Sequence, residues 1–455
     1  MCIVGVIYMK EQHFLVVGAG RSGVAAAKLL LDVKKDVTVF DSNTSLDTSA
    51  FCAKIGVQVP FILGEIRPEQ LPHFDVCVVS PGVSLETDVM KAVAAAEIPI
   101  WSEIELAYRF DKGQVVAITG TNGKTTTTSL TYEIVKEWNK NTLLVGNIEI
   151  PYTGLALTSV EGGCTVAEIS SFQLETMRTV KPRVSAVLNI TPDHLDRHKT
   201  MENYSALKLS ISKCQNKDDF CVLNYEDDYL RKHANEVPCN VVFFSSGHIL
   251  ESGVYLENDE FVIAFNGKRQ VLCKTDEVNL VGTHNYENIM AAAAITFCLG
   301  VPIEIIRSVV KRFTAVEHRI EFVCEKSGVK YYNDSKGTNT DAAIKAVDAM
   351  PGTTVLIGGG YDKKSDFSEW VEHFPGKVRL LVLLGQTREK IAAACDKIGF
   401  SDYVFAESME EAVRICSENA KSGDCVLLSP ACASWGMFKC YQERGNIFKE
   451  LVKAL

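Results

Sequence analysis

The chain has 455 residues, 47% of them hydrophobic and 23% charged, with a formal net charge of −10. This length corresponds to about three domains of ~150 residues, and the composition is that of a globular protein. The acidic balance excludes nucleic acid as the main partner, because a surface that binds a polyanion normally carries an excess of Lys and Arg.

The amino-terminal stretch Met1–Tyr8 is apolar but has no basic leader and no small-residue cleavage site. A secretory signal is therefore not expected, and either Met1 or Met9 fits as the natural start. No apolar run approaches the ~20 residues that span a bilayer, so we expect no membrane insertion. The 15 cysteines are scattered, without the spacing of a zinc ribbon or a redox pair. A reduced, cytoplasmic protein is expected.

Strand-like apolar runs alternate with helical stretches along the chain. The runs are Phe14–Val17, Val37–Phe40, Val76–Val79, Val115–Ile118, Val184–Leu188, Thr354–Ile357, Leu380–Leu384 and Cys425–Leu428. This alternation is typical of parallel α/β sheets. Between Val237 and Val281, short alternating runs are separated by Asn, Asp and Glu. They predict a small antiparallel insertion.

Two boundaries divide this pattern. One lies near Trp101, before the strand that leads into a glycine loop, and the other lies near Ala315, after a predicted helix. Each resulting segment begins a new series of strands. We therefore expect an α/β protein of three domains: a Rossmann-like domain over 1–101, a central P-loop-type mononucleotide-binding domain over 102–315, and a carboxy-terminal Rossmann-like domain over 316–455.

The first segment carries a glycine loop, Gly18–Gly23, directly after its first strand, and Asp41 closes the next strand. Alone, this pattern predicts NAD or FAD, with Asp41 on a ribose hydroxyl. A dehydrogenase has no use for the second phosphate loop found downstream, however, so any nucleotide-linked ligand fits. Ser80-Pro81-Gly82 follows another strand and reads equally as a ligand contact or as a simple turn.

The most informative segment is Thr119–Thr127, which follows an apolar strand and leads into a helix. Its glycines allow close approach of the backbone to phosphate oxygens, Lys124 supplies a cation, and the Thr125 hydroxyl can ligate magnesium. The standard P-loop has a glycine where this chain has Ile118. The loop is therefore a shortened variant that predicts binding of a nucleoside triphosphate.

Two further polar clusters follow strands of the central segment. Glu168 ends the strand around Val166, and beside a phosphate loop it suits magnesium, although such a residue can also be a solvated strand end. In Asn189–His198, two histidines have the spacing of a helical zinc pair but lack the intervening glutamate of a metalloprotease. We assign His194 to the site and His198 to the surface.

The third segment contributes His318-Arg319, Asn333–Asn339, Gly358–Lys364 and Ser429–Ser434. Its Arg and Lys side chains can stabilise charge on a phosphoryl group in transfer. The alternative, ordinary surface cations, suits Lys364 better than Lys336. Cys432 has no histidine near it in sequence, so a nucleophilic role is not expected.

Together these motifs resemble the Mur ligase family over essentially the whole chain. The family's ATP loop, GTNGK[ST]T, stands at Gly120–Thr126, and its signature E-[LI]-S-S-F-Q-L-E stands at Glu168–Glu175. The segments DH-x-D-R, HNYxN, HR, NDSKxTN and SPACAS stand at Asp193–Arg197, His284–Asn288, His318–Arg319, Asn333–Asn339 and Ser429–Ser434.

The resemblance implies an ATP-dependent amide ligase that adds D-glutamate to UDP-N-acetylmuramoyl-L-alanine through an acyl phosphate, in peptidoglycan precursor synthesis. It also implies two Mg²⁺ ions, with Mn²⁺ as a substitute, and a monomer. The alternatives are a sister ligase or folylpolyglutamate-type ligase for another amino acid, a nucleotide-binding protein without turnover, and a nicotinamide oxidoreductase.

The resemblance also implies roles for individual residues. The ATP-binding set is Gly120, Thr121, Asn122, Gly123, Lys124, Thr125, Thr126, Asn285, Arg319 and Asp334. The metal ligands are Thr125, Glu168, His194 and a carbamylated Lys208, and the catalytic set is Lys124, Glu168, His194 and Lys208. Without the resemblance, Lys208 would be interpreted as a charge on a helix surface.

For the UDP-substrate, the implied residues are Gly20, Ser22, Asp41, Ser80 and Asn147. For D-glutamate they are Lys336, Thr338, Lys363, Ser434 and Tyr441. The chain departs from the family pattern at Asn43, where an arginine is usual, at Tyr441, where a phenylalanine is usual, and at Trp435-Gly436. These departures concern the two substrate pockets rather than the reaction.

Overall fold

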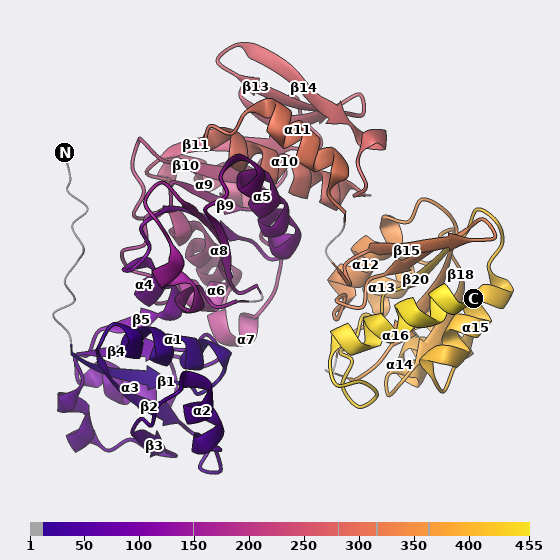
Figure 1. The fold of residues 1–455 in the computed structure, drawn as a ribbon. Helices are drawn as coiled ribbons and strands as arrows, with labels where there is room; N and C mark the ends of the chain where they lie inside the picture. The colour runs from indigo at the N-terminus through magenta and orange to yellow at the C-terminus, as the bar shows by residue number, and fades with distance from the viewer. Residues whose placement is uncertain (1–11, 149, 281, 315–316, 363–364) are drawn as a thin grey trace. The chain divides into compact units, whose positions relative to one another are not determined.

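The computed structural model describes residues 12–455 except 149, 281, 315–316 and 363–364. The two candidate start residues and Lys363 and Lys364 therefore lie outside the described residues. The chain forms two compact units, one of residues 1–273 and 287–310 and the other of residues 274–286 and 311–455. The described residues build three sheets, and all eight predicted strands are confirmed (Figure 1).

The amino-terminal sheet is parallel, with the strand order β3-β2-β1-β4-β5. Its elements are β1 His13–Val17, β2 Asp36–Asp41, β3 Phe61–Leu63, β4 Val76–Val79, β5 Ile100–Ser102, α1 Arg21–Asp32, α2 Thr48–Ile55, α3 Asp88–Ala95 and α4 Glu103–Tyr108. Phe14 of β1 packs in the core that includes α1, and Leu15 packs in the core that includes α3. Both faces are covered, which is why these strands are continuously apolar.

The central sheet has nine strands, in the order β14-β13-β12-β11-β10-β9-β6-β8-β7. The strands are β6 Gln114–Thr119, β7 Thr142–Gly146, β8 Cys164–Glu168, β9 Val184–Val187, β10 Phe220–Asn224, β11 Asn240–Ser245, β12 Gly253–Glu257, β13 Glu260–Phe265 and β14 Lys268–Lys274. The helices are α5 Lys124–Trp138, α6 Ser171–Leu174, α7 Leu195–His198, α8 Met201–Leu209, α9 Asp228–His233, α10 Thr283–Cys298 and α11 Ile303–Arg312.

The antiparallel insertion starts later than the sequence suggests. Strand β11 lies within the predicted insertion, but it pairs in parallel with β10, and β12 pairs in parallel with β11. The antiparallel pairing begins between β12 and β13. The short polar breaks between the strands gave no sign of this, because strand direction depends on the connection and not on the alternation of side chains.

The carboxy-terminal sheet has the order β15-β16-β20-β17-β18-β19, and among its described strand pairs only β15 and β16 are antiparallel. Its elements are β15 Glu321–Lys326, β16 Val329–Asn333, β17 Thr354–Gly359, β18 Val378–Leu384, β19 Tyr403–Phe405, β20 Cys425–Leu428, α12 Thr340–Asp348, α13 Ser368–Glu372, α14 Arg388–Lys397, α15 Met409–Asn419 and α16 Tyr441–Ala454. Helices α12, α13 and α14 share one core with the sheet, and α15 and α16 share the other (Figure 1).

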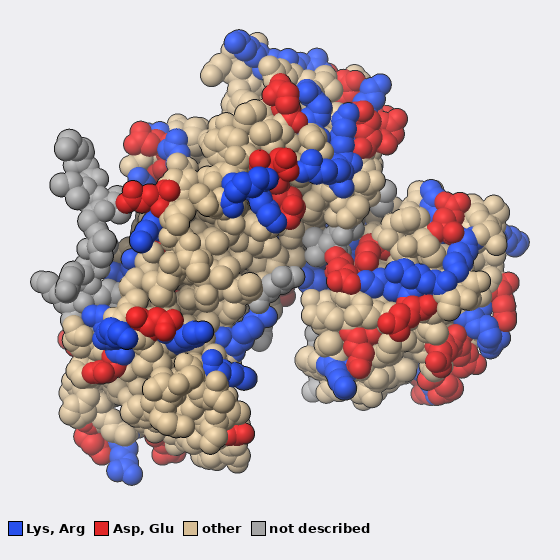
Figure 2. Space-filling view, viewed as in Figure 1, with Lys and Arg blue, Asp and Glu red and all other residues tan. Residues whose placement is uncertain are grey.

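Lys and Arg side chains are interspersed with Asp and Glu over the visible face of both units (Figure 2). Within the described part of the chain, no helix is both long and apolar enough to cross a membrane.

The carboxy-terminal core offers a matched test of burial. Phe374 is fully buried and contacts Trp370 and Phe400, whereas Phe405 on the edge strand is 44% exposed. Phe374→Ala should lower the free energy of unfolding by about 3–5 kcal/mol, because it leaves a cavity. Phe405→Ala should cost roughly 0.5 kcal/mol. Urea unfolding of the full chain measures both, and equal losses would contradict this assignment of the core.

Candidate active site

The phosphate loop between β6 and α5 is held by the loop that follows β9. The backbone N–H of Thr121 donates to the carbonyl of Asn189 at 2.9 Å, and that of Asn122 donates to the Asn189 side-chain oxygen at 2.8 Å. The Asn189 amide in turn donates to the Asn122 carbonyl at 3.1 Å. These bonds fix the loop between two adjacent parallel strands, so its shape is set before any ligand binds.

Glycine is required at the point where this loop enters the helix. Gly123 has φ of 80°, and a Cβ added to it would lie 2.2 Å from Oδ1 of Asn288. The same Asn288 oxygen accepts a hydrogen bond from the Thr127 hydroxyl at 3.1 Å. Asn288, the last residue of HNYxN, therefore contacts the first turns of α5.

Two lysine amines meet at one backbone carbonyl of this loop. Lys124 Nζ donates to the carbonyls of Gly120 and Thr121 at 2.9 and 2.8 Å, and Lys208 Nζ donates to the Gly120 carbonyl at 2.8 Å. Lys208 is 1% exposed, which corrects its reading as a surface charge. Burial, with the nearby Lys124 charge, lowers the pKa of Lys208 to about 6. At neutral pH this amine is largely uncharged and hence nucleophilic.

Glu168 is the last residue of β8 and pairs with Ile118 of β6. Ile118 stands two residues before Gly120, where the phosphate loop begins. Glu168 is 2% exposed. Its Oε1 accepts a hydrogen bond from the Asn147 amide at 2.9 Å, whereas its buried Oε2 has no hydrogen-bond partner among the described residues. A buried carboxylate oxygen without a partner is costly unless a ligand satisfies it. Asn147, predicted for the UDP-substrate, is thus placed at this carboxylate.

The two histidines after β9 lie in different environments, and that of His198 differs from the prediction. His194 has φ of 51° and a half-exposed side chain, whose Nε2 lies 3.4 Å from Asp193 Oδ2. His198 was assigned to the surface but is buried: its Nε2 is 3.0 Å from the Ser171 hydroxyl. The turn of α7 directs it inward, against the ring of Tyr204. Burial lowers the pKa of His198, which favours its neutral form.

The residues around the phosphate loop fit a hard cation. No group of three or more His, Cys, Asp or Glu side chains among the described residues is arranged to hold a metal by itself. Magnesium, however, usually takes one or two carboxylates together with phosphate oxygens and water. The unpartnered Oε2 of Glu168 and the Thr125 hydroxyl at the start of α5 suit that mode.

The amino-terminal domain has a hollow of about 810 Å³ at the carboxyl edge of its sheet, lined by residues that include Gly18, Asp41 and Val83. Asp41 accepts hydrogen bonds from the N–H groups of Ala19 at 2.8 Å and Asn43 at 2.9 Å. The Ser80 hydroxyl donates to the Gly18 carbonyl at 3.1 Å. Two of the predicted UDP-substrate residues, Asp41 and Ser80, therefore shape one site. Gly20 is the N-cap residue of α1, and Ser22 lies in the first turn of that helix.

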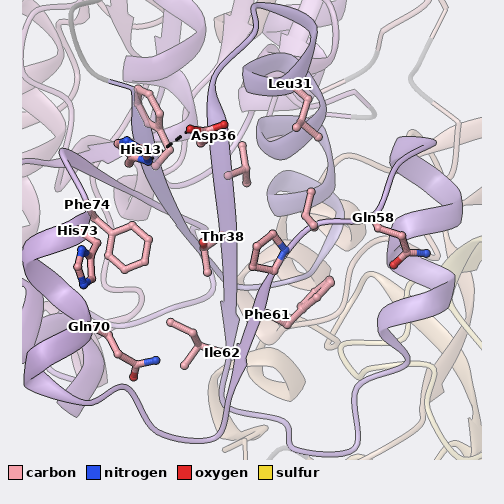
Figure 3. A pocket seen from close by; sticks show the side chains of 14 residues that line it. His13, Leu31, Asp36, Thr38, Gln58, Phe61, Ile62, Gln70, His73 and Phe74 are labelled. Atoms are coloured by element: carbon pink, nitrogen blue, oxygen red, sulfur yellow. Dashed lines mark ion pairs between the residues drawn. The ribbon is translucent and has the colours of Figure 1, made fainter.

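A second hollow, of about 600 Å³, lies at the opposite, amino ends of the same strands (Figure 3). His13 and Asp36 approach to 3.5 Å at its rim. Its lining includes none of the residues predicted to bind a nucleotide. Ligands of open parallel sheets bind at the carboxyl edge, so the first hollow suits a ligand better than the second.

In the carboxy-terminal unit, the loops after β16 and β20 meet through Asp334. Its Oδ2 accepts a hydrogen bond from the Ser429 hydroxyl at 2.7 Å, and its Oδ1 accepts one from the Ile320 N–H at 3.3 Å. Burial raises the pKa of Asp334 to about 7, while Ser429 and the nearby Arg319 oppose the shift. The Nε of Arg319 is buried without a hydrogen-bond partner among the described residues.

Most of the predicted D-glutamate residues lie on these same loops. Lys336 Nζ lies 5.8 Å from the centre of the Tyr441 ring. Ser434 is buried at the end of the loop after β20, and the Thr338 N–H donates to the Lys336 carbonyl at 2.9 Å. Lys363 lies outside the described residues. Asn285 is buried at the start of α10, in the same unit.

Arg444, which no sequence motif indicates, joins the loops of this edge. Its Nη2 donates to the Ser335 carbonyl at 2.8 Å and its Nη1 donates to the Cys432 carbonyl at 3.1 Å. It is 2% exposed. Arg444 lies in α16 among other charged residues, so the sequence does not distinguish it, and only the fold shows that it is buried against these loops.

Comparison with known proteins defines the class. The family model of the Mur ligase middle domain matches residues 118–296, that of the Mur ligase glutamate ligase domain matches 318–432, and that of the MurD-like amino-terminal domain matches 12–102. The chain therefore belongs to the Mur ligase family.

Relatives that are similar to this chain share the name of one particular ligase of this family. The UDP-N-acetylmuramoylalanine–D-glutamate ligases of Lachnoclostridium phytofermentans and Lachnospira eligens are each 51% identical to it. The matches cover 97% of this chain and 98% of the relative in the first case, and 98% and 100% in the second. The corresponding ligase of Thermoanaerobacter pseudethanolicus is 44% identical, with 98% and 99% covered.

Solved structures share the fold at lower identity. UDP-N-acetylmuramate-alanine ligase MurC from Thermotoga maritima matches with a TM-score of 0.61 and 17% identity, over 98% of this chain and 99% of that one. MurF ligase from Thermotoga maritima in complex with ADP matches with a TM-score of 0.59 and 18% identity, over 100% and 98%. The three-domain α/β fold is thus that of the Mur ligases.

The close contact at Gly123 predicts a loss of ATP binding on substitution. Gly123→Ala would strain a left-handed residue and push Asn288 away from the first turns of α5, so affinity for ATP should fall at least about tenfold. Gly162→Ala is the matched control, because Gly162 has φ of 74° but open space around its Cβ position. Equilibrium binding of a fluorescent ATP analogue measures both, and similar affinities for the two variants would contradict the role of the contact.

The raised pKa of Asp334 predicts a pH-dependent stability. The folded state holds this proton up to about pH 7 while the unfolded chain loses it near pH 4, so stability from this group falls as pH rises through that window. Asp334→Asn should remove the dependence. The melting temperature of the wild type relative to the variant should be higher at pH 5 than at pH 8, and a constant difference would show that Asp334 is not protonated in the folded state.

Proposed function

We propose that this chain is an ATP-dependent ligase that joins D-glutamate to UDP-N-acetylmuramoyl-L-alanine in the synthesis of peptidoglycan precursors. The observation that carries the proposal is the meeting of Lys124 and Lys208 at the Gly120 carbonyl, in the same sheet edge as the unpartnered oxygen of Glu168. The names of the relatives that are 51% identical over nearly the whole chain support the substrates.

We assign one substrate to each domain. Residues 1–101 bind the uridine nucleotide at the hollow lined by Asp41, residues 102–315 bind ATP at the phosphate loop, and residues 316–455 bind D-glutamate. We also propose ATP as the ligand of Asn285, Arg319 and Asp334. Lys336, Thr338, Lys363, Ser434 and Tyr441 complete the site for the amino acid.

When ATP binds at the phosphate loop, its phosphate oxygens replace backbone carbonyls as hydrogen-bond acceptors of the loop. Lys124 Nζ leaves the Gly120 and Thr121 carbonyls for phosphate oxygens. The N–H groups at the start of α5, from Gly123 to Thr126, are directed at the phosphates, where the helix dipole favours negative charge.

Magnesium would be held by Thr125, Glu168, His194 and a carbamylated Lys208. When bound, magnesium neutralises charge on the phosphates and on the attacking carboxylate. The low pKa of Lys208 supports this assignment, because an uncharged buried amine can add to CO₂ and lose a proton to give a carbamate. A carbamate places an anion next to the Lys124 ammonium, and the two opposite charges attract each other.

The reaction then follows two steps. A carboxylate oxygen of UDP-N-acetylmuramoyl-L-alanine attacks the γ-phosphorus of ATP, which forms an acyl phosphate and releases ADP. The uncharged amine of D-glutamate attacks the acyl carbon, the C–N bond forms, the C–O bond to phosphate breaks, and the amine nitrogen loses a proton. Lys124 remains on the transferring phosphoryl group and stabilises the charge that develops there.

Phosphate release from ATP and magnesium tests the proposal, with UDP-N-acetylmuramoyl-L-alanine and D-glutamate each present or omitted. Release should require both. L-glutamate, lysine and meso-diaminopimelate in place of D-glutamate then test the alternative of a sister ligase. This arm is needed because the chain departs from the family pattern at Trp435-Gly436 and Tyr441. Release that needs neither substrate would refute the ligase assignment. A monomer in the cytoplasm remains our prediction.

The carbamate makes a separate prediction. Lys208→Ala should lose most activity, about 100-fold or more, because it removes an anionic ligand. Added short carboxylates, such as acetate or propionate, should restore part of it by occupying the vacated space. Lys213→Ala is a control, since this lysine lies on the same stretch of chain and contacts the Met177 carbonyl instead. Near-normal turnover of Lys208→Ala would exclude a carbamate.

A further inference from the structure

Arg197 closes the DH-x-D-R segment, and none of the steps above uses it. Its guanidinium makes contacts on two sides. Towards its own domain, Nε donates to Glu175 Oε1 at 2.9 Å and Nη2 donates to Glu175 Oε2 at 2.5 Å. Towards the amino-terminal domain, Nη1 donates to the Pro81 carbonyl at 3.0 Å and Nη2 donates to the Val83 carbonyl at 3.1 Å.

We call this arrangement, the Arg197 guanidinium with the Glu175 carboxylate and the 81–83 backbone, the clamp. Its side chains are largely removed from solvent. The side chains of Arg197 and Glu175 are 14% and 15% exposed, and the guanidinium lies 4.2 Å from the centre of the Phe172 ring. A two-pronged arginine–carboxylate pair fixes direction as well as distance, and a lysine cannot reproduce it. The orientation of the guanidinium, and hence of both bonds to the 81–83 backbone, is therefore set by Glu175.

The backbone that Arg197 holds belongs to the proposed nucleotide site. Val83 lines the hollow with Asp41, and its N–H donates to the Ser80 carbonyl at 3.0 Å. Ser80 in turn donates to the Gly18 carbonyl. At its other end the clamp belongs to the reaction centre, because Arg197 follows His194 by three residues and the rings of Phe172 and His194 are 4.8 Å apart.

We propose that Arg197, oriented by Glu175, is a positioning residue that sets the distance between the uridine-nucleotide site and the phosphate-loop site. This rests on the proposed function, since it concerns a substrate that carries a nucleotide at one end and the reacting carboxylate at the other. Such a ligand needs both sites in register, whereas a ligand that occupies only one of them does not.

The chain supplies a matched control. Lys199 Nζ lies 3.2 Å from a carboxylate oxygen of Glu86 and so joins the same two domains. Both of these side chains are more than half exposed, at 56% and 67%. Solvent and salt screen such a pair, so it contributes little to the register.

The test compares a short ligand with a long one. Calorimetric titration of the full chain with UDP and with UDP-N-acetylmuramoyl-L-alanine gives two affinities for the wild type and for Arg197→Ala, Arg197→Lys and Lys199→Ala. We expect Arg197→Ala to weaken binding of the long ligand at least about tenfold and that of UDP less than twofold. Arg197→Lys should resemble Arg197→Ala, and Lys199→Ala should resemble the wild type.

The other outcomes overturn the proposal in distinguishable ways. Equal weakening of both ligands would mean that Arg197 only supports the local fold of the 80–83 loop, and unchanged binding of both would mean that the clamp has no role. If Arg197→Ala does not fold, Arg197→Lys decides by the same comparison. A wild type that binds UDP but not the long ligand would refute the proposed function itself.

A second readout uses turnover. Arg197→Ala should raise the KM for the UDP-substrate and leave the KM for ATP within about twofold, because the phosphate loop has its own supports in Asn189 and Asn288. Added guanidinium or ethylguanidinium should recover part of the loss, by restoring the bonds to Glu175 and to the 81–83 backbone. A parallel rise in both KM values without recovery would contradict the proposal.

Discussion

The meeting of two lysine amines at the Gly120 carbonyl is the constraint on which the site depends. Lys124 and Lys208 bring two amines to one backbone oxygen, and burial together with the Lys124 charge disfavours a charge on Lys208. The energetic conflict is relieved when an anion arrives or when Lys208 changes its chemical form. The loop is therefore built for negative charge, and its shape is set before the ligand binds because Asn189 bonds its backbone and Asn288 accepts from the Thr127 hydroxyl in α5.

The parallel sheets explain why the functional groups converge. Strands β6, β8 and β9 are neighbours, so the phosphate loop, Glu168 and the Asn189–His198 loop emerge at one edge. The same rule joins Gly18, Asp41 and Ser80 in the amino-terminal domain, and Asp334 with Ser429 in the carboxy-terminal domain. In each case the scaffold is apolar and continuous, and the chemistry is carried by the turns that follow it.

The sequence predicted the eight principal strands, the glycine loop between a strand and a helix, and the position of Glu168 at the end of its strand, because periodicity and loop chemistry are local properties. It did not reveal that Lys208 is buried, that His198 faces inward or that β11 runs parallel to β10. Those facts depend on which segments pack together. The roles of Arg197 and Arg444 are hidden for the same reason: each binds backbone carbonyls of distant loops, and a carbonyl leaves no mark in the sequence.

The acyl phosphate is the central claim of this account, and oxygen transfer tests it most directly. The ligase is supplied with UDP-N-acetylmuramoyl-L-alanine labelled with ¹⁸O in both oxygens of the reacting carboxylate, together with ATP, magnesium and D-glutamate. Mass spectrometry then measures the phosphate released. Transfer of one labelled oxygen to each phosphate is the predicted result, because the carboxylate oxygen that attacks phosphorus leaves with it. Unlabelled phosphate alongside the amide product would contradict an acyl-phosphate mechanism.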